Sequence, residues 1–302
     1  MITPPNLKPG DTIGIVAPAR KIEKSDIEAA VKIFEQWGLY IVFGKNLFNQ
    51  ERQFAGTDIE RANDLQFMLD DPNIKAIICA RGGYGTIKVL PHLDFSRFIK
   101  NPKWIVGYSD ITALHAHLNQ NLGVKTIHGI MPLNFPRDSI QNRAIKTLKK
   151  ALWGNPGDYV VSSHPFNRKG EVTGKLVGGN LSVLYSISGS KYDINMKGKI
   201  LFIEDLDEYL YHIDRMMMNL KYSGKLENLK GLVVGGMTGM NDNTVAYGRT
   251  AYEIIQEAVD EYHYPVCYHF PAGHIPDNLA LVLGATVELN ITGEGARVKF
   301  RD

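Results

Sequence analysis

The first half of the chain alternates short apolar runs with longer amphipathic stretches. Four apolar or β-branched segments have the length of strands: Thr12–Ala17, Tyr40–Phe43, Ile74–Ala80 and Trp104–Gly107. Three further segments repeat apolar residues every three or four positions, which predicts helices: Lys24–Trp37, Asp58–Leu69 and Ile111–Leu118. Strands that alternate with helices favour a parallel sheet covered by helices. We therefore expect an N-terminal α/β domain.

The second half mixes both patterns in a less regular order. Its apolar runs predict strands at Lys199–Ile203, Gly231–Gly235, Leu279–Asn290 and Ala296–Phe300. Helical spacing marks Tyr211–Lys221 and Val245–Val259. Between the halves, Asn155–Gly157 and the polar stretch Ser162–Gly170 break the pattern. These breaks predict an N-terminal domain over residues 1–155, a linker over 156–170 and a mixed C-terminal α/β domain over 171–302.

Composition and charge narrow the class of protein. Hydrophobic residues make up 44% of the 302 residues, an ordinary share for a globular protein. The formal net charge is only +2, without any Lys/Arg block, so we expect no nucleic-acid partner. No apolar run approaches the roughly 20 residues of a membrane helix. The N-terminus lacks the basic and apolar regions of a signal peptide, which predicts a cytoplasmic protein. Cys79 and Cys267 lie in separate apolar runs, so neither a disulfide nor a metal site is indicated.

The strongest chemical signal is a serine where a strand turns directly into a helix. Ser109 follows the apolar segment Trp104–Gly107 and precedes the helical spacing from Ile111. In open α/β folds ligands lie at this edge of the sheet, and a helix N-terminus offers N–H donors to an anion. Position 111 is not glycine, so the G-x-S-x-G motif of esterases is absent. The simpler alternative is that Ser109 only caps the helix.

A glycine-rich loop follows a second strand in the same manner. Residues Arg81–Gly85 read Arg-Gly-Gly-Tyr-Gly directly after Ile74–Ala80. Glycines permit positive φ angles and close approach of backbone N–H groups to a ligand. The loop lacks the lysine and the spacing of a phosphate-binding loop, and a tight turn is its simpler explanation.

A serine nucleophile requires a base and a third group that orients this base. Nine histidines are available, and position alone does not select among them. His128 and His274 both follow predicted strands, and His274 lies in the loop Pro271–Asn278, where rigid sheets place catalytic groups. Among the acids, Glu204 is the first residue after the apolar run Ile200–Ile203. A solvated acidic loop or a helix cap would explain Glu204 equally well.

Several segments taken together resemble the L,D-carboxypeptidase family, the muramoyltetrapeptide carboxypeptidases. The resemblance covers nearly the whole chain, and its order of motifs is more specific than any single one. The segments that carry it are Leu7–Asp11, Ile15–Pro18, Phe54–Asp58 with Arg61, Arg81–Gly85, Gly107–His115, His128–Gly129, Gly178–Leu181, Leu201–Asp205, Tyr211 with Asp214–Arg215, and Gly273–His274.

The resemblance implies a fold, a catalytic triad and a reaction. The family's Ser, Glu and His correspond to Ser109, Glu204 and His274 here. The serine belongs to the N-terminal α/β domain and the other two to the C-terminal domain, with the site between them. The implied enzyme is a serine peptidase that removes the terminal D-Ala of a murein tetrapeptide in cell-wall recycling. It uses no cofactor and no metal, and family members commonly form homodimers.

Further roles follow from this implied mechanism. The oxyanion would be held by backbone N–H groups of Asp110 and of the loop with Gly82 and Gly83. Arg81, next to these glycines, is a candidate for the terminal carboxylate of the substrate, or else pairs with an acid across the domain boundary. Two alternative functions remain at this stage. One is cleavage of peptide–nucleotide conjugates, as in microcin-C self-immunity proteins, and the other is a non-catalytic two-lobed binding protein.

Overall fold

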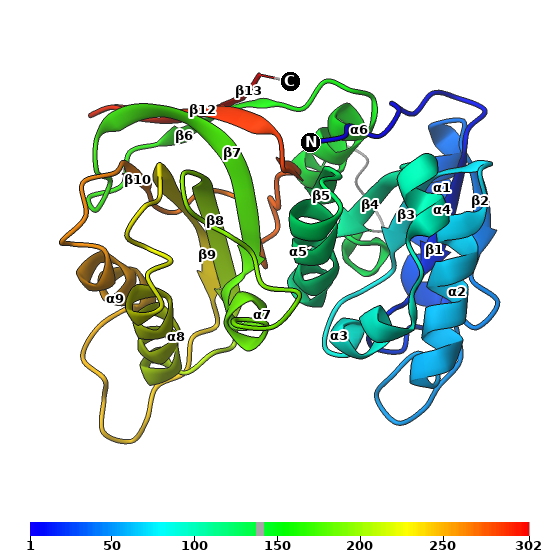
Figure 1. Ribbon diagram of the computed structural model, residues 1–302, viewed down its shortest axis with the longest axis horizontal. Coiled ribbons are helices and arrows are strands. Elements are labelled where there is room, and N and C mark those ends of the chain that lie inside the picture. The colour runs from blue at the N-terminus through cyan, green and yellow to red at the C-terminus, as the bar shows by residue number, and fades with distance from the viewer. Residues whose placement is uncertain (137–141, 302) are drawn as a thin grey trace. The chain divides into compact units, whose positions relative to one another are not determined.

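The computed structural model describes residues 1–136 and 142–301, which form two compact units, each with its own sheet (Figure 1). The first unit contains Met1–Pro156 together with Leu279–Val282. The second contains Gly157–Asn278 and the rest of the C-terminal segment from Leu283. None of the helices in the described part of the chain has the length and apolarity to cross a membrane.

The first unit is built on a six-stranded sheet in the order β11-β5-β4-β3-β1-β2. Its strands are β1 (Thr12–Val16), β2 (Tyr40–Phe43), β3 (Ile74–Cys79), β4 (Trp104–Gly107), β5 (Thr126–His128) and β11 (Leu281–Leu283). The pairs β2–β1, β1–β3, β3–β4 and β4–β5 are all parallel. The central strands are buried nearly throughout, as near-continuous apolar runs require in a covered parallel sheet. The predicted N-terminal α/β fold is confirmed.

Helices join these strands and bury their apolar faces. They are α1 (Lys24–Gln36), α2 (Asp58–Asp70), α3 (Thr86–Val89), α4 (Ser96–Lys100), α5 (Thr112–Asn121) and α6 (Arg143–Leu152), with short 3-10 turns η1 (Leu90–His92), η2 (Ser109–Ile111) and η3 (Pro132–Asn134). Helix α2 begins with a capping box in which Thr57 and Glu60 satisfy each other's backbone N–H groups. Helix α1 meets α6 through an edge-to-face contact of Trp37 and Trp153. These helices complete an apolar core around the sheet.

The second unit has a seven-stranded mixed sheet in the order β10-β9-β8-β7-β12-β13-β6. Its strands are β6 (Asp158–Ser162), β7 (Gly170–Asn180), β8 (Ile200–Leu206), β9 (Gly231–Thr238), β10 (Val266–Cys267), β12 (Thr286–Ile291) and β13 (Gly295–Phe300). The strands from β7 to β10 run parallel, whereas β7, β12, β13 and β6 pair antiparallel. Helices α7 (Leu181–Ser186), α8 (Leu210–Tyr222) and α9 (Ala251–Ala258) contact one another in series.

Some sequence expectations differ from the structure in position. The helix predicted over Val245–Val259 begins only at Ala251, because Thr250 caps it together with Glu253. The single strand predicted over Leu279–Asn290 is two strands, interrupted at Gly284, which has a positive φ of 88°. Its first part, β11, joins the sheet of the first unit, and its second part, β12, joins the other sheet.

The division into units also differs in detail from the expected domains. The segment 156–170, expected as a linker, contains β6, which pairs with β13. The four residues Leu279–Val282, expected in the C-terminal domain, group with the first unit. The predicted domain boundaries at 1–155 and 171–302 stay a prediction.

Candidate active site

Ser109 occupies a strained turn between β4 and α5. Its φ angle is 62°, in the left-handed region that a serine adopts at a cost of roughly 1–2 kcal/mol. The turn is tight because Gly107 lacks a side chain, since a Cβ there would lie 2.8 Å from Ile111 Cγ1. Strain of this kind is typical of functional sites, and esterases expose their nucleophile on a comparable strand-to-helix turn. Helix capping alone does not require this backbone conformation.

The glycine loop after β3 lies directly against Ser109. A Cβ at Gly82 would come within 2.9 Å of Ser109 Cβ and 3.4 Å of the Asp110 backbone nitrogen. The next residue, Gly83, has a φ of 113° that only glycine adopts readily. The structure thus brings together the sequence-predicted set of Ser109, Gly82, Gly83 and the backbone of Asp110 within the first unit.

The side chain of Asp110 ties this turn to the neighbouring helix. Its carboxylate accepts a hydrogen bond of 2.8 Å from the backbone N–H of Thr86, at the start of α3. The carboxyl group is buried, and burial raises the pKa of Asp110, although Thr86 and the charge of Arg61 oppose this rise. Asp110 therefore supports the turn through its side chain, while its backbone N–H lies beside Gly82.

Arg61 is a buried guanidinium that holds three loops together. From α2 it donates hydrogen bonds to the carbonyl oxygens of Pro18 (2.5 Å), Gly85 (3.1 Å) and Gly56 (3.3 Å), and it pairs with Asp58. These carbonyls belong to the segments after β1, before α2 and after β3. Because five N–H groups form a rigid fork, arginine suits such a role better than lysine. Arg61 thereby fixes the loop that contains Gly82 and Gly83.

Arg81 is partly buried beside the same loop. Its Nη1 donates to the Lys21 carbonyl oxygen at 2.8 Å, and its Nε is buried without a hydrogen-bond partner among the described residues. Burial lowers the pKa of Arg81, and the positive charge of Arg20 lowers it further. Arg81 is thus the chain neighbour of Gly82, and its guanidinium binds the segment after β1.

The second unit contains a histidine–carboxylate pair. Nδ1 of His274 lies 2.6 Å from Oε2 of Glu204, and the backbone N–H of His274 donates to the same oxygen at 3.3 Å. Glu204 is fully buried in β8, at an irregularity in the pairing of β8 with β9. Such bulges redirect side chains and occur often beside active sites. The predicted Glu204 and His274 are therefore joined, although they are 70 positions apart.

Gly273 allows this contact to form. Its φ angle is 109°, and a Cβ at this position would lie 2.7 Å from both Cβ and Oε2 of Glu204. The backbone N–H of Gly273 donates to Asn278 Oδ1 at 2.8 Å, which fixes the loop after β10. The loop can approach the buried carboxylate because this residue has no side chain.

The pKa of His274 reflects opposing influences. Burial lowers it, but the hydrogen bond and negative charge of Glu204, together with the charge of Asp205, outweigh burial and raise the pKa above its ordinary value. A carboxylate bound to Nδ1 also holds the proton on that nitrogen and leaves Nε2 of the neutral ring as the proton acceptor. This tautomer is the one that a general base requires.

Asp205 is a second buried carboxylate next to the pair, and sequence reasoning assigned no role to it. Its oxygens accept hydrogen bonds from Asn180 Nδ2 (2.9 Å), the Ser182 backbone N–H (2.8 Å) and the Leu206 backbone N–H (2.9 Å). Burial and the adjacent charge of Glu204 raise the pKa of Asp205 to about 7 despite these donors. The sequence signal that could have pointed to Asp205 is its place directly after Glu204, at the end of an apolar strand.

Three further histidines have neighbours of their own. His115 is buried, its Nε2 lies 2.9 Å from the Gly107 carbonyl oxygen, and burial lowers its pKa to about 4. His128, which the sequence left as an alternative base, is buried in β5 against the Tyr108 ring. His212 of α8 pairs with Glu208, which lies just before this helix, at 2.5 Å. Within residues 1–136 and 142–301, no three His, Cys, Asp or Glu side chains are grouped to hold a metal ion.

A serine on a strained strand-to-helix turn and a histidine bound to a buried glutamate are the kinds of group that serine hydrolases use. Models of the LD-carboxypeptidase N-terminal and C-terminal domains match residues 13–129 and 173–289. The chain therefore belongs to the LD-carboxypeptidase family, peptidase S66, and is a serine-type carboxypeptidase. This membership sets aside the alternative of a non-catalytic binding protein.

Individual relatives agree over almost the whole chain. A protein of Bacillus subtilis named "Probable murein peptide carboxypeptidase" is 35% identical over 98% of this chain and 94% of its own length. The crystal structure of muramoyltetrapeptide carboxypeptidase from Oxalobacter formigenes matches with a TM-score of 0.88 at 27% identity, over 96% of this chain and 99% of that one. The microcin C7 self-immunity protein of Escherichia coli is 28% identical, over 96% of this chain and 93% of its own.

Proposed function

We propose that this enzyme cleaves the L,D peptide bond that releases the terminal D-Ala from a murein tetrapeptide. The observation that carries the proposed chemistry is the 2.6 Å contact between His274 Nδ1 and the buried Oε2 of Glu204. The substrate class is supported by the relatives from Bacillus subtilis and Oxalobacter formigenes, whose names refer to murein peptides and muramoyltetrapeptide.

In the proposed mechanism, Ser109 and the pair of His274 and Glu204 act as one catalytic set. Neutral His274 takes the proton of the Ser109 hydroxyl while the Ser109 oxygen attacks the scissile carbonyl carbon. The protonated imidazole then gives this proton to the amine of the leaving D-Ala, and an acyl-enzyme remains on Ser109. Water, deprotonated by His274, hydrolyses the acyl-enzyme and restores the serine. Glu204 orients the ring and stabilises the imidazolium in both halves.

The oxyanion of each tetrahedral intermediate requires hydrogen-bond donors beside Ser109. The close approach of Gly82 to Ser109 and to the Asp110 nitrogen supports a role for these backbone N–H groups, with Gly83 as a neighbouring donor. Backbone donors held by a rigid loop stabilise developing charge without reorganising. Removal of one such donor costs about 10²–10³ in kcat.

An exopeptidase must also recognise the free carboxylate of its substrate, and we assign this role to Arg81. Its partly buried position near Gly82 supports the assignment. Arg81→Lys removes the bidentate geometry and should weaken catalysis on the free acid. A substrate with an amidated terminus lacks this contact. Catalysis on it should therefore be far less affected by the substitution. Equal losses on both substrates would show that Arg81 serves structure only.

The substrate itself can be tested by comparing three compounds. Murein tetrapeptide ending in D-Ala should lose one alanine, while the same peptide ending in L-Ala should be turned over much more slowly. A peptide–nucleotide conjugate tests the alternative function, which the likeness to the microcin C7 self-immunity protein favours. Faster cleavage of the conjugate than of the tetrapeptide would replace the murein assignment by this alternative.

We also propose that the enzyme works in the cytoplasm on recycled wall fragments and as a homodimer. The absence of a membrane-spanning helix from the described residues is compatible with this location. A fractionation experiment with a marker for each compartment checks the location directly. Recovery of the protein outside the cytoplasmic fraction would refute it.

A further inference from the structure

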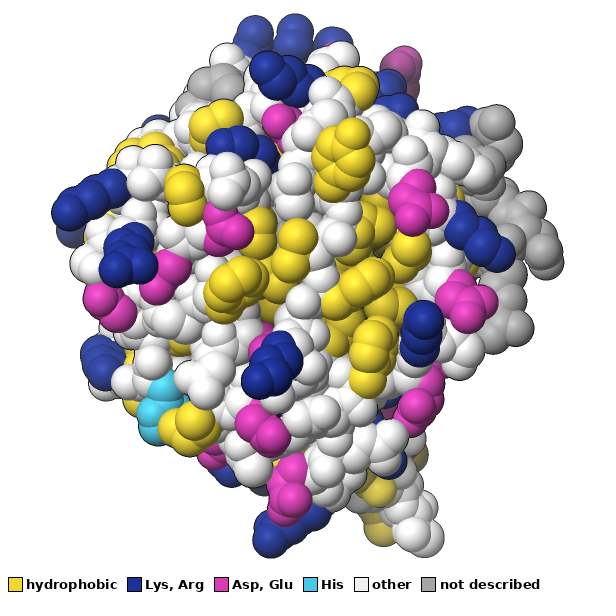
Figure 2. Space-filling model, turned by 90° about the vertical axis from the view of Figure 1, so that its right-hand side faces the viewer, with side chains coloured by type: hydrophobic (Ala, Val, Ile, Leu, Met, Phe, Trp, Pro, Cys, Tyr) yellow, Lys and Arg dark blue, Asp and Glu magenta, His cyan; other side chains and the backbone are white. Residues whose placement is uncertain are grey.

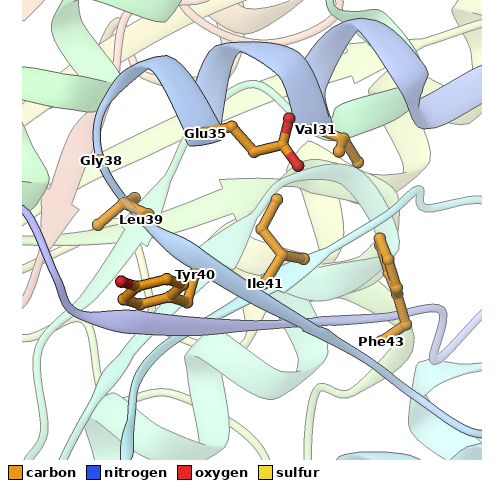
Figure 3. Close-up of a pocket in the computed structure, with 7 residues that line it drawn as sticks. All are labelled: Val31, Glu35, Gly38, Leu39, Tyr40, Ile41 and Phe43. Carbon is orange, nitrogen blue, oxygen red and sulfur yellow. The ribbon is translucent and has the colours of Figure 1, made fainter.

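The grooves beside the edge strand β2 are poorly suited to an anionic ligand. Figure 2 shows hydrophobic side chains gathered near the centre of the face on this side of the molecule. A groove of about 530 Å³ between α1 and β2 is lined mainly by apolar residues, and Glu35 is the charged residue in its lining (Figure 3). A second groove, towards α2, is lined by Glu60 and Asp64 and by a single base, Lys45. Because acids outnumber bases in both linings, these grooves disfavour a substrate with several carboxylates.

The loop beside Ser109 presents positive charge instead. Arg20 follows β1, and its backbone N–H donates to the Gly82 carbonyl oxygen at 3.4 Å. Its side chain lies against Gly83, where a Cβ would come 2.6 Å from Cγ and 3.2 Å from Nε of Arg20. Gly83 therefore leaves space for this side chain as well as adopting the positive φ of its own turn. A guanidinium is thus packed on the glycine loop that lies against Ser109.

The charge of Arg20 is held in place but not neutralised. Its Nε and Nη2 donate to Gln53 Oε1, a neutral amide oxygen, at 3.3 and 3.2 Å. The residue is exposed, and it has no ion pair in the described part of the chain. The acids at the start of α1 bind other groups: Glu23 accepts a hydrogen bond from Gln50, and Asp26 accepts one from the backbone N–H of Glu23. The remaining N–H groups of Arg20 can therefore bind a carboxylate in the forked geometry that arginine favours.

Arg81 places a second guanidinium at the other end of this loop. It directly precedes Gly82, and its Nη1 donates to the carbonyl oxygen of Lys21, the chain neighbour of Arg20. Burial and the positive charge of Arg20 lower the pKa of Arg81, and the negative charge of Asp26 opposes this only in part. The two arginines therefore repel each other, and an anionic ligand would relieve this repulsion.

We propose that Arg20 binds the side-chain carboxylate of the substrate residue that precedes the scissile bond, so that the enzyme prefers diaminopimelate over lysine at this position. This assignment rests on the proposed function, in which that residue is the third of a murein tetrapeptide. Murein peptides have a diamino acid there. The side chain of diaminopimelate ends in a carboxylate and an ammonium group, whereas that of lysine ends in an ammonium group alone. Arg20 favours the first side chain and disfavours the second.

The place of Arg20 on the loop supports this choice of substrate group. In the proposed mechanism the carbonyl oxygen of the third residue is bound by the loop of Gly82 and Gly83, so its side chain begins beside that loop. A Cβ at Gly82 would lie 3.2 Å from Ser109 Oγ, and neighbouring Cα atoms are about 3.8 Å apart, so the Arg20 guanidinium is on the order of 10 Å from the Ser109 hydroxyl. An extended diaminopimelate side chain covers most of that distance. The terminal carboxylate lies on the other side of the scissile bond, where Arg81 is its assigned partner.

Turnover of two tetrapeptides that differ only at the third residue tests the assignment. Both end in D-Ala, one contains diaminopimelate and the other lysine, and the released alanine is measured for each. The unmodified enzyme should favour the diaminopimelate peptide in kcat/KM by about 10- to 100-fold, the effect of one charge-assisted contact. Arg20→Ala should lose this factor on the diaminopimelate peptide, mainly through a higher KM, and should lose little on the lysine peptide. The variant keeps the backbone hydrogen bond to Gly82, so the loop itself is retained.

Two further variants separate contact with Arg20 from a general effect of charge. Gln53→Glu keeps the size of the side chain and places a carboxylate on the same N–H groups of Arg20, so the preference should disappear although Arg20 is present. Arg52→Glu changes the charge by a larger amount at the neighbouring position, where the arginine side chain is 86% exposed and pairs with Glu51. Because solvent and salt screen such a charge, this variant should keep the preference. A loss of preference in Arg52→Glu equal to that in Gln53→Glu would overturn a direct contact.

The same measurements separate the role of Arg20 from the function on which it rests. Equal losses of Arg20→Ala on both peptides would assign Arg20 to a carboxylate that the peptides share and would overturn its role at the third residue, and so would unchanged kinetics on both. Equal release of alanine from the two peptides by the unmodified enzyme would overturn the preference while the proposed function stands. Release from neither peptide would overturn the proposed function, and the role of Arg20 with it.

Discussion

At the scale of single residues, the candidate site depends on backbone conformations that side chains ordinarily resist. Ser109 has a φ angle of 62°, and Gly273 has a φ angle of 109° at a place where a Cβ would lie 2.7 Å from Glu204. At Ser109 the surrounding structure maintains a conformation that a serine disfavours, whereas Gly273 adopts its φ readily because it has no side chain. Such positions are recognised only when φ angles and close approaches are known. The sequence identifies the glycine but not the carboxylate that it must approach.

Gly273→Ala should therefore disrupt the His274–Glu204 contact. The new Cβ would lie 2.7 Å from Glu204, and displacement of catalytic groups by about 1 Å can cost 10²-fold in rate. We expect kcat to fall by about 10²-fold or more, together with a lower melting temperature. Gly248→Ala is the control, because Gly248 also has a positive φ of 80° but no described atom lies within 4 Å of its Cβ position. If both variants lost activity equally, backbone strain rather than contact with Glu204 would be the cause.

The acid side of the pH–rate profile should report His274. Only the neutral ring can accept a proton, so the rate should fall as the pH drops through the raised pKa of His274. The negative charge of Asp205 contributes to that rise while this carboxyl, whose own pKa is about 7, is ionised, and Asp205→Asn removes the charge. The acid limb of kcat/KM should then move to lower pH in this variant, because the imidazolium is less stabilised.

A purely structural role of Asp205 predicts a different outcome. Asparagine cannot accept all the hydrogen bonds that Asn180, Ser182 and Leu206 donate, so this variant should also be less stable to unfolding by about 1–3 kcal/mol. If stability fell while the pH profile kept its position, Asp205 would not act on the pKa of His274. A flat profile between about pH 5 and pH 8 in the unmodified enzyme would contradict a histidine base.

At the scale of elements, periodicity predicted the helices and buried strands that surround Ser109 with boundaries close to those observed. The same reasoning missed β7 (Gly170–Asn180), because its first half alternates exposed polar residues and its second half is rich in glycine. The predicted helix over Val245–Val259 begins too early, because apolar spacing continues before the cap of α9 at Thr250. Arg61 lies on the same buried face of α2 as Leu65 and Met68. This spacing was a sequence signal that its guanidinium is buried.

Arg61 should contribute far more to stability than an exposed arginine with a similar ion pair. Arg61→Lys cannot reach the carbonyls of Pro18, Gly56 and Gly85 at once, and a lysine there would leave buried acceptors unpaired. We expect the free energy of unfolding to fall by about 3 kcal/mol, measured by denaturant titration. Arg297→Lys changes an exposed pair with Asp158 and should cost less than about 1 kcal/mol. Similar losses in the two variants would contradict a clamping role.

At the scale of the whole molecule, the chain divides less simply than its sequence indicates. Residues Leu279–Val282 return to the first unit after the loop that holds His274, so the unit borders do not follow one break in the sequence. Nine histidines and many acids left the base and its partner open, because a contact between residues 70 positions apart leaves no local pattern. The family resemblance selected Glu204 and His274, and the structure shows that these two side chains are in contact.

Mass analysis of murein tetrapeptide incubated with the purified chain tests most directly whether Ser109 makes this protein an L,D-carboxypeptidase. The unmodified enzyme should convert the tetrapeptide to a tripeptide by loss of one alanine. Ser109→Ala should retain the fold, checked by circular dichroism, while kcat falls by about 10⁴–10⁶ because the nucleophile is missing. An intact tetrapeptide after incubation with the unmodified enzyme, or near-normal turnover by Ser109→Ala, would contradict the assignment.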